Sequence, residues 1–127
     1  MTIQVAILAA GMGTRLGRPW PKPLTKLDDG RSIMGQQRDN ISEVFGEQAR
    51  VITVVGFKLE SILEEFPDGL FVYNENFDTT NTSKSLLKAL RMSGSGPVVW
   101  MNGDVVFDGE VLRRLESSIL RGDNVIC

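Results

Sequence analysis

The sequence predicts an α/β fold, a Rossmann-like and mostly parallel sheet with helices on both faces. Short apolar runs typical of buried strands alternate along the chain with segments whose apolar residues recur at helical spacing. The 127 residues, 42% of them hydrophobic and 24% charged, suffice for one domain with its own core. No internal repeat or linker divides them, so residues 1–127 are expected to act as one unit.

The first part of the chain contributes three strands and two helices. Strands are expected over residues 3–10, 50–55 and 70–73, and helices near residues 33–45 and 59–66. The first strand is almost continuously apolar, as expected for a strand covered on both faces. Met34, Arg38, Ile41 and Phe45 recur at helical spacing, which defines the first helix. Pro67 ends the second helix, because proline cannot continue one.

The second part continues the alternation. A helix is expected over residues 82–92, a strand over 97–101, a helix that ends near Gly122, and the start of another strand at 124–127. Asp108 is expected to cap the helix that follows it. Since ligands in parallel α/β sheets bind beyond the carboxyl ends of the strands, polar residues that follow strands are the candidate site.

Residue types limit the chemistry. The chain has no histidine, which excludes histidine bases and histidine-ligated zinc, and its one cysteine, Cys127, excludes an internal disulfide. The first 26 residues hold four basic residues, Arg15, Arg18, Lys22 and Lys26, and no acid, although the net charge is −2. This local cationic segment favours a small anionic ligand over nucleic acid, or is a chance cluster of solvated charges.

Nothing in the sequence predicts contact with a membrane. No apolar run approaches the roughly 20 residues that a spanning helix needs. The apolar start lacks a preceding basic residue and is too short for a signal peptide, so a cytoplasmic location is expected.

A glycine-rich loop follows the first strand directly. In Gly11-Met12-Gly13-Thr14-Arg15, glycines permit a sharp turn whose amides can surround phosphate oxygens, and Arg15 adds a permanently charged donor. A dinucleotide-binding loop is disfavoured because the third glycine comes one position late and prolines would break the required helix. A Walker A loop is excluded because Gly-Lys-Ser/Thr is absent. An ordinary tight turn stays open as the alternative.

The segment Pro21-Lys22-Pro23 strengthens the phosphate interpretation. Prolines on both sides restrict where the lysine amine can reach. No acidic residue lies near Lys22 or Arg15 in the sequence to neutralise them. Both cations are therefore expected to serve one polyphosphate.

The segment from Leu8 to Leu24, LAAGMGTRLGRPWPKPL, resembles the signature of nucleotidyltransferases that join a nucleoside monophosphate to a sugar phosphate or alcohol phosphate. The resemblance implies that the glycine loop holds the nucleotide and its β- and γ-phosphates, and that Lys22 lies near the α-phosphate. Arg15 and Lys22 are thus the expected catalytic residues. The nucleotide-binding residues expected on this basis are Leu8, Ala10, Gly11, Met12, Gly13, Thr14, Arg15 and Lys22.

A second constellation ends the strand near residues 98–101. There Asn102-Gly103-Asp104 places a carboxylate after a glycine, where it can point into the ligand crevice or cap a turn. The family has a Gly-Asp pair at this point, and the resemblance implies that Asp104 binds Mg²⁺.

Residues 74–86 resemble a segment of the choline-phosphate cytidylyltransferase branch that lies beside the nucleotide. Asn81 and Ser85 are the implied contacts to base and ribose. The alternative is that Thr80 or Asn81 only caps the following helix.

The function expected from these features is Mg²⁺-dependent transfer of CMP from CTP to a phosphorylated small-molecule acceptor, with release of pyrophosphate. The alternatives are a sugar-1-phosphate nucleotidyltransferase that uses UTP, dTTP or another nucleotide, and a nucleotide-binding fragment or regulatory module without turnover. The resemblance covers only the amino-terminal half of the family domain. A truncated sheet is therefore expected, with an exposed edge that favours self-association.

Overall fold

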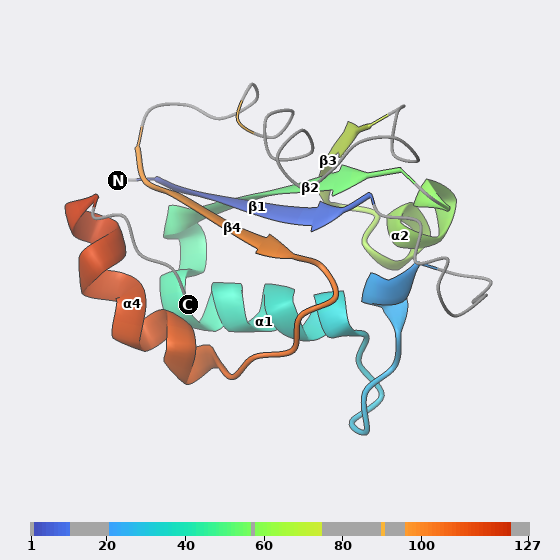
Figure 1. The fold of residues 1–127 in the computed structure, drawn as a ribbon, viewed down its shortest axis with the longest axis horizontal. Helices are drawn as coiled ribbons and strands as arrows, with labels where there is room; N and C mark the ends of the chain where they lie inside the picture. The colour runs from blue at the N-terminus through green and yellow to red at the C-terminus, as the bar shows by residue number, and fades with distance from the viewer. Residues whose placement is uncertain (1, 11–20, 57, 75–89, 91–95, 123–127) are drawn as a thin grey trace.

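The computed structural model describes residues 2–10, 21–56, 58–74, 90 and 96–122. Its strands are β1 (Ile3–Ala9), β2 (Ala49–Val55), β3 (Leu70–Tyr73) and β4 (Val98–Asn102). Its helices are α1 (Ile33–Phe45), α2 (Leu59–Glu65) and α4 (Gly109–Arg121), with short 3-10 turns η2 (Lys22–Leu24) and η3 (Gly46–Gln48). Figure 1 shows the sheet with α1 and α4 packed along it.

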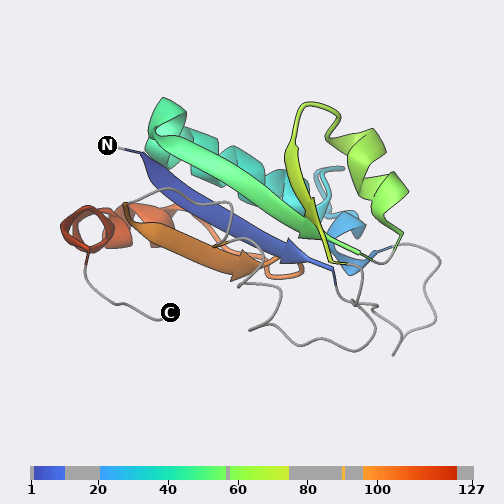
Figure 2. The ribbon, with the colours of Figure 1, turned by 90° about the horizontal axis from the view of Figure 1, so that it is seen from above.

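The four described strands form one sheet in the order β3-β2-β1-β4, and every pair is parallel. This confirms the predicted parallel α/β architecture. From β1 the chain proceeds to β2 on one side and later to β4 on the other, so the direction of winding reverses between β1 and β4 (Figure 2). Parallel sheets bind ligands beyond the carboxyl ends of the strands at such a switch point.

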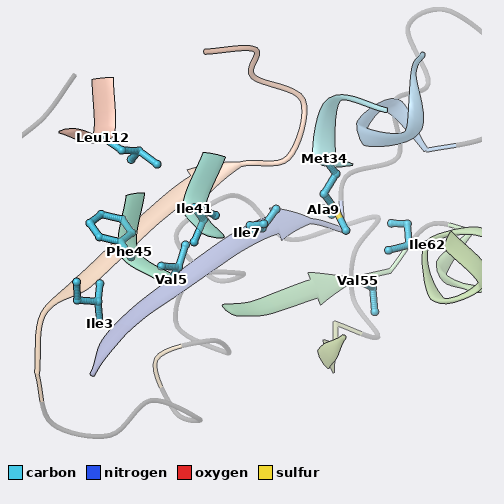
Figure 3. Packing of buried hydrophobic residues seen from close by; sticks show 10 residues of the cluster. All are labelled: Ile3, Val5, Ile7, Ala9, Met34, Ile41, Phe45, Val55, Ile62 and Leu112. Carbon is cyan, nitrogen blue, oxygen red and sulfur yellow. The ribbon is translucent and has the colours of Figure 1, made fainter. Parts of the chain in front are cut away.

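β1 is the central strand, and all seven of its residues are buried. Its alternate residues serve two clusters, because successive side chains of a strand point to opposite faces. Ile3, Val5, Ile7 and Ala9 join the larger cluster, and Ala6 and Leu8 join the smaller one. The larger cluster also takes in side chains of all three described helices, Met34, Ile41, Phe45, Ile62 and Leu112 (Figure 3). The continuous apolar run predicted this burial on both faces.

Helix α1 has the bounds that its apolar spacing predicts. Ser32 caps it, because its hydroxyl oxygen accepts a hydrogen bond from the Gly35 amide at 3.0 Å. Arg38 belongs to the predicted stripe but is only half-buried, and its guanidinium stacks over the ring of Phe66, 4.9 Å from the ring centroid. Burial lowers the pKa of Arg38 from its ordinary value.

The predicted cap of the last helix is confirmed. The Asp108 carboxylate accepts a hydrogen bond from the Glu110 amide at 2.9 Å. Gly122, whose φ is +77°, caps the other end of α4 directly after Arg121. The three described helices cover one face of the sheet. The strand expected over residues 124–127 lies outside the described residues. So does the helix expected over 82–92, except for Leu90. None of the helices described combines the length and the apolar character that crossing a membrane requires.

Candidate functional site

Two segments far apart in the sequence meet beyond the carboxyl ends of β1 and β4. Lys22 opens η2, and Asp104 lies two residues after β4. The Lys22 Nζ and the Asp104 Oδ2 are 3.4 Å apart, and the two side chains are 50% and 37% exposed. The structure thus brings together the predicted phosphate-binding lysine and the predicted metal-binding carboxylate at the switch point of the sheet.

Lys22 is fixed through its backbone. Pro21 and Pro23 on either side of it are buried, while the lysine side chain is exposed. The Leu24 amide donates to the Pro21 carbonyl at 3.0 Å. The Thr25 amide and hydroxyl both donate to the Lys22 carbonyl, at 3.0 and 2.7 Å. The flanking prolines therefore anchor a short turn from which the exposed lysine side chain reaches Asp104, and the phosphate-binding role of Lys22 stays a prediction.

Asp104 occupies a turn anchored to the sheet. The Val105 amide donates to the Asn102 carbonyl at 3.3 Å, which closes the turn. The Gly103 amide donates to the Leu8 carbonyl at 2.9 Å, which extends the β1–β4 hydrogen bonding by one residue. Asp104 comes directly after this last bond to β1, and its carboxylate reaches Lys22.

The ion pair was not predicted, since the sequence shows no acid near Lys22. Folding supplies that acid from the end of β4. Pairs this exposed contribute little to stability, because water screens both charges. The chemical interest of this pair is that a cation and a carboxylate lie side by side, a combination that complements a ligand carrying both negative phosphates and a positive metal ion.

Asp104 is the described residue of this site that could hold a metal ion. Among the residues that the structure describes, no three His, Cys, Asp or Glu side chains gather into a metal-binding group. A carboxylate oxygen that is partly exposed at the strand ends matches the way proteins hold Mg²⁺, through one or two carboxylates plus phosphate oxygens and water. The donor set fits a hard divalent cation and offers no preformed cage for a metal alone.

The other predicted nucleotide-binding residues divide into two groups. Leu8 and Ala10 are buried, 8% and 3% exposed, and pack in the smaller cluster. They therefore present little side-chain surface to a ligand, and any contact they make is expected to be through the backbone. Gly11, Met12, Gly13, Thr14, Arg15, Asn81 and Ser85 lie outside the described residues.

Sequence reasoning missed Gln37, a fully buried side chain of α1 that donates hydrogen bonds to the turn carrying Asp104. A signal was present. Gln37 lies three residues after Met34 and four before Ile41, in the middle of the apolar stripe of α1. A polar residue on the core face of a helix is informative because burial requires it to find a partner.

Comparisons with known proteins identify the family of this chain. Residues 5–127 match a family model described as a MobA-like NTP transferase domain. A CMP-5'-(3-aminopropyl)phosphonate synthase from Streptomyces rubellomurinus is 34% identical over 91% of this chain and 19% of its own length. The bifunctional protein GlmU from Picosynechococcus is 36% identical over 81% of this chain and 23% of its own length. The chain thus spans about a fifth of the length of these relatives.

Solved structures share the fold. A nucleotidyl transferase from Methanothermobacter thermautotroptrophicus superposes with a TM-score of 0.76 at 25% identity, covering 91% of this chain and 57% of its own. The CTP:phosphocholine cytidylyltransferase LicC from Streptococcus pneumoniae gives a TM-score of 0.68 at 21% identity over 87% and 50%. Rv0371c from Mycobacterium tuberculosis, solved in complex with manganese, gives 0.68 at 23% identity over 92% and 59%.

Proposed function

Because the chain belongs to the MobA-like NTP transferase domain family, we propose that it forms the nucleotide-binding half of a nucleotidyltransferase domain. The proposed reaction moves CMP from CTP to a phosphorylated small-molecule acceptor and releases pyrophosphate. The observation that carries the proposal is the pairing of Lys22 with Asp104, 3.4 Å apart at the switch point between β1 and β4. A magnesium nucleotide matches this pair because its phosphates complement the lysine and its metal complements the carboxylate.

The residues act by positioning and by charge. An oxygen of the acceptor phosphate attacks the α-phosphorus of CTP in line, the α–β bridging bond breaks, and its electron pair leaves with pyrophosphate. The acceptor oxygen is already ionised near pH 7, so the reaction needs no general base. A sequence without histidine is therefore compatible with it. Lys22 stabilises charge at the α-phosphate, while Arg15 and the amides of residues 11–15 hold the leaving pyrophosphate. Asp104 would hold the divalent cation, which would supply neutralisation of phosphate charge.

The preference for CTP rests on three supports. The segment with Asn81 and Ser85 resembles the choline-phosphate cytidylyltransferase branch. One relative is named for a CMP-linked phosphonate, and LicC is named for CTP and phosphocholine. Both names contain a small molecule in which a phosphorus oxyanion is attached to a group that carries a cationic nitrogen, an ammonium in one and a quaternary ammonium in the other. We therefore place the acceptor of this protein in that chemical class.

A different nucleotide is the second candidate. A neighbour of the same fold, HddC from Yersinia pseudotuberculosis, was solved with GMP-PN, so the fold accepts a guanine nucleotide. Under this candidate the protein is a sugar-1-phosphate nucleotidyltransferase that uses UTP, dTTP or another nucleotide. Calorimetric titration with CTP, UTP, dTTP, ATP and GTP, each with Mg²⁺, separates the two. Tightest binding of CTP supports the cytidylyltransferase, and tightest binding of another nucleotide contradicts it.

Turnover needs a separate measurement. Pyrophosphate release is followed with CTP, Mg²⁺ and a panel that includes phosphocholine, 3-aminopropylphosphonate and sugar 1-phosphates. Release with one acceptor class supports the transferase. Nucleotide binding without release from any acceptor favours the third candidate, a nucleotide-binding fragment or regulatory module.

The edge of the sheet supports the proposed self-association. Among the described strands β4 pairs only with β1, and Val98 and Trp100 on it are 38% and 47% exposed. A strand whose second edge has no partner in the described part of the structure offers backbone groups for pairing with another chain, and these exposed apolar side chains add surface to such a contact. Size-exclusion chromatography tests this, since a concentration-dependent shift to larger species is expected and a monomer at every concentration contradicts it.

A further inference from the structure

Gln37 links α1 to the turn that presents Asp104. Its side chain is 0% exposed, and its amide Nε2 donates to the Asn102 carbonyl at 2.9 Å and to the Val105 carbonyl at 2.7 Å. These two carbonyls stand at the two ends of the turn Asn102-Gly103-Asp104-Val105. One buried amide therefore clamps both ends of the four-residue segment that carries the carboxylate.

The orientation of this amide is determined by its partners. Both groups that it faces are carbonyl oxygens, which accept hydrogen bonds and donate none, so only the NH₂ end of the side chain can point at the turn. The Gln37 Oε1 is buried without a hydrogen-bond partner in the described part of the structure. A buried oxygen without a hydrogen bond costs free energy. The two bonds that Nε2 donates must offset this cost, since the side chain keeps the orientation that leaves Oε1 unsatisfied.

On its other side the turn is bonded to β1. The Gly103 amide donates to the Leu8 carbonyl of β1 at 2.9 Å, so β1 fixes the beginning of the turn. The carbonyl of Val105, at the end of the turn, receives its hydrogen bond from Gln37. Without the Gln37 bonds the turn itself is no longer tied to α1, whose next bond reaches only Phe107, and the direction of the Asp104 side chain becomes less defined.

We propose that Gln37 is a positioning residue that holds Asp104 in the geometry required to bind the metal ion of a metal–nucleotide complex. The inference rests on the proposed function, in which Asp104 is the metal ligand. Gln37 itself touches neither metal nor nucleotide in this scheme. It orients the metal ligand through hydrogen bonds, and the loss of residues that do so typically weakens metal affinity about 10–100-fold.

The neighbouring Asn40 provides a matched control. It lies one helical turn further along α1, and its amide Nδ2 donates to the Phe107 carbonyl at 2.9 Å, in the same connection between β4 and α4. Gln37 and Asn40 thus make the same kind of bond from the same helix, but only Gln37 bonds the turn that contains Asp104. Asn40→Leu removes an amide of this kind without touching that turn.

The test measures how strongly a metal ion aids nucleotide binding. The dissociation constant for CTP is determined calorimetrically in EDTA and in saturating Mn²⁺, and the first value divided by the second is the metal coupling ratio. A purely structural defect weakens both constants alike and leaves this ratio unchanged. We expect Gln37→Met to lower the ratio about tenfold. We expect Asn40→Leu to leave it within about twofold of the unsubstituted protein, because its bond lies outside the turn.

A double variant separates the proposal from the function on which it rests. In an Asp104→Asn background, adding Gln37→Met is expected to change nothing further, because the residue that Gln37 positions is gone. An unchanged ratio in Asp104→Asn alone contradicts the metal role in the proposed function and removes the basis of the inference. A reduced ratio in Asp104→Asn together with an unchanged ratio in Gln37→Met overturns the inference alone. An equal effect of Gln37→Met in both backgrounds also overturns it.

The Gln37→Met protein is first checked for a cooperative thermal transition. If it lacks one, Gln37→Asn replaces it, since this shorter amide stays polar but cannot span both carbonyls. The same ratio and the same double variant then decide the question.

Discussion

The ring of Pro23 occupies the space next to Gly103 that a larger residue would need. A β-carbon at residue 103 would lie 3.0 Å from the Pro23 Cγ and 3.3 Å from both the Ala9 Cβ and the Leu8 carbonyl oxygen. This close approach packs the turn that carries Lys22 against the turn that carries Asp104. The ion pair of Lys22 and Asp104 is therefore a consequence of how the two neighbouring backbones fit together.

Gly103→Ala is expected to disturb this fit. Its methyl group meets a proline ring, a β-carbon and a carbonyl oxygen, none of which is the end of a flexible side chain. Overpacking of this kind costs about 1–3 kcal/mol of unfolding free energy. Urea denaturation measures the loss. Gly109→Ala is the control, since a β-carbon there meets only Asn40, at 3.4 Å, and alanine favours the helix. Equal stability of the two variants would contradict the proposed packing constraint.

Lys22→Ala is expected to affect chemistry far more than stability. The lost ion pair is exposed and contributes at most about 1 kcal/mol. The lost phosphate donor is expected to lower kcat about 10²–10³-fold in a pyrophosphate-release assay with the complete enzyme. Lys26→Ala is a suitable control, because Lys26 also forms an exposed ion pair, with Glu65 at 3.3 Å. Near-normal turnover by Lys22→Ala would remove this lysine from the mechanism.

Asp104→Asn is expected to abolish the benefit that Mg²⁺ brings to a bound nucleotide. A ligand that binds only the folded state raises its stability in proportion to the logarithm of concentration over Kd. Thermal unfolding with CTP should therefore show a further rise in Tm on adding Mg²⁺ to the unsubstituted protein and none in the variant. Asp108→Asn removes a carboxylate from the same connection, yet asparagine caps helices equally well. If it also loses the Mg²⁺ effect, the assignment to Asp104 is wrong.

Asp108→Ala tests the cap of α4 independently of any ligand. Its carboxylate accepts the Glu110 amide at 2.9 Å, and losing such a cap costs about 0.5–2 kcal/mol. Chemical denaturation should show that loss for Asp108→Ala and little change for Asp108→Asn. If the two variants are equally destabilised, the negative charge of Asp108 matters and its capping hydrogen bond does not.

Much of the fold could be predicted because its signals are local. The bounds of α1 follow from apolar residues at helical spacing and from Ser32, whose hydroxyl satisfies an amide three residues away. The burial of β1 follows from its unbroken apolar composition. Arg38 shows where this reasoning weakens. Its place in the stripe indicated burial, but its long side chain keeps the guanidinium on the ring of Phe66 at the margin of the core.

The sequence by itself determined the alternation of strands and helices, their caps and the family signature from Leu8 to Leu24, since each depends on neighbours within a few residues. Tertiary structure alone decided which residues distant in the sequence come into contact. Asp104 becomes the partner of Lys22, and Gln37 reaches carbonyls 65 and 68 residues away, because β4 pairs with β1 and α1 packs beneath both. Such contacts leave no periodic trace in the sequence. They depend on which strand edges pair and in what register, a choice made by the burial of the whole sheet.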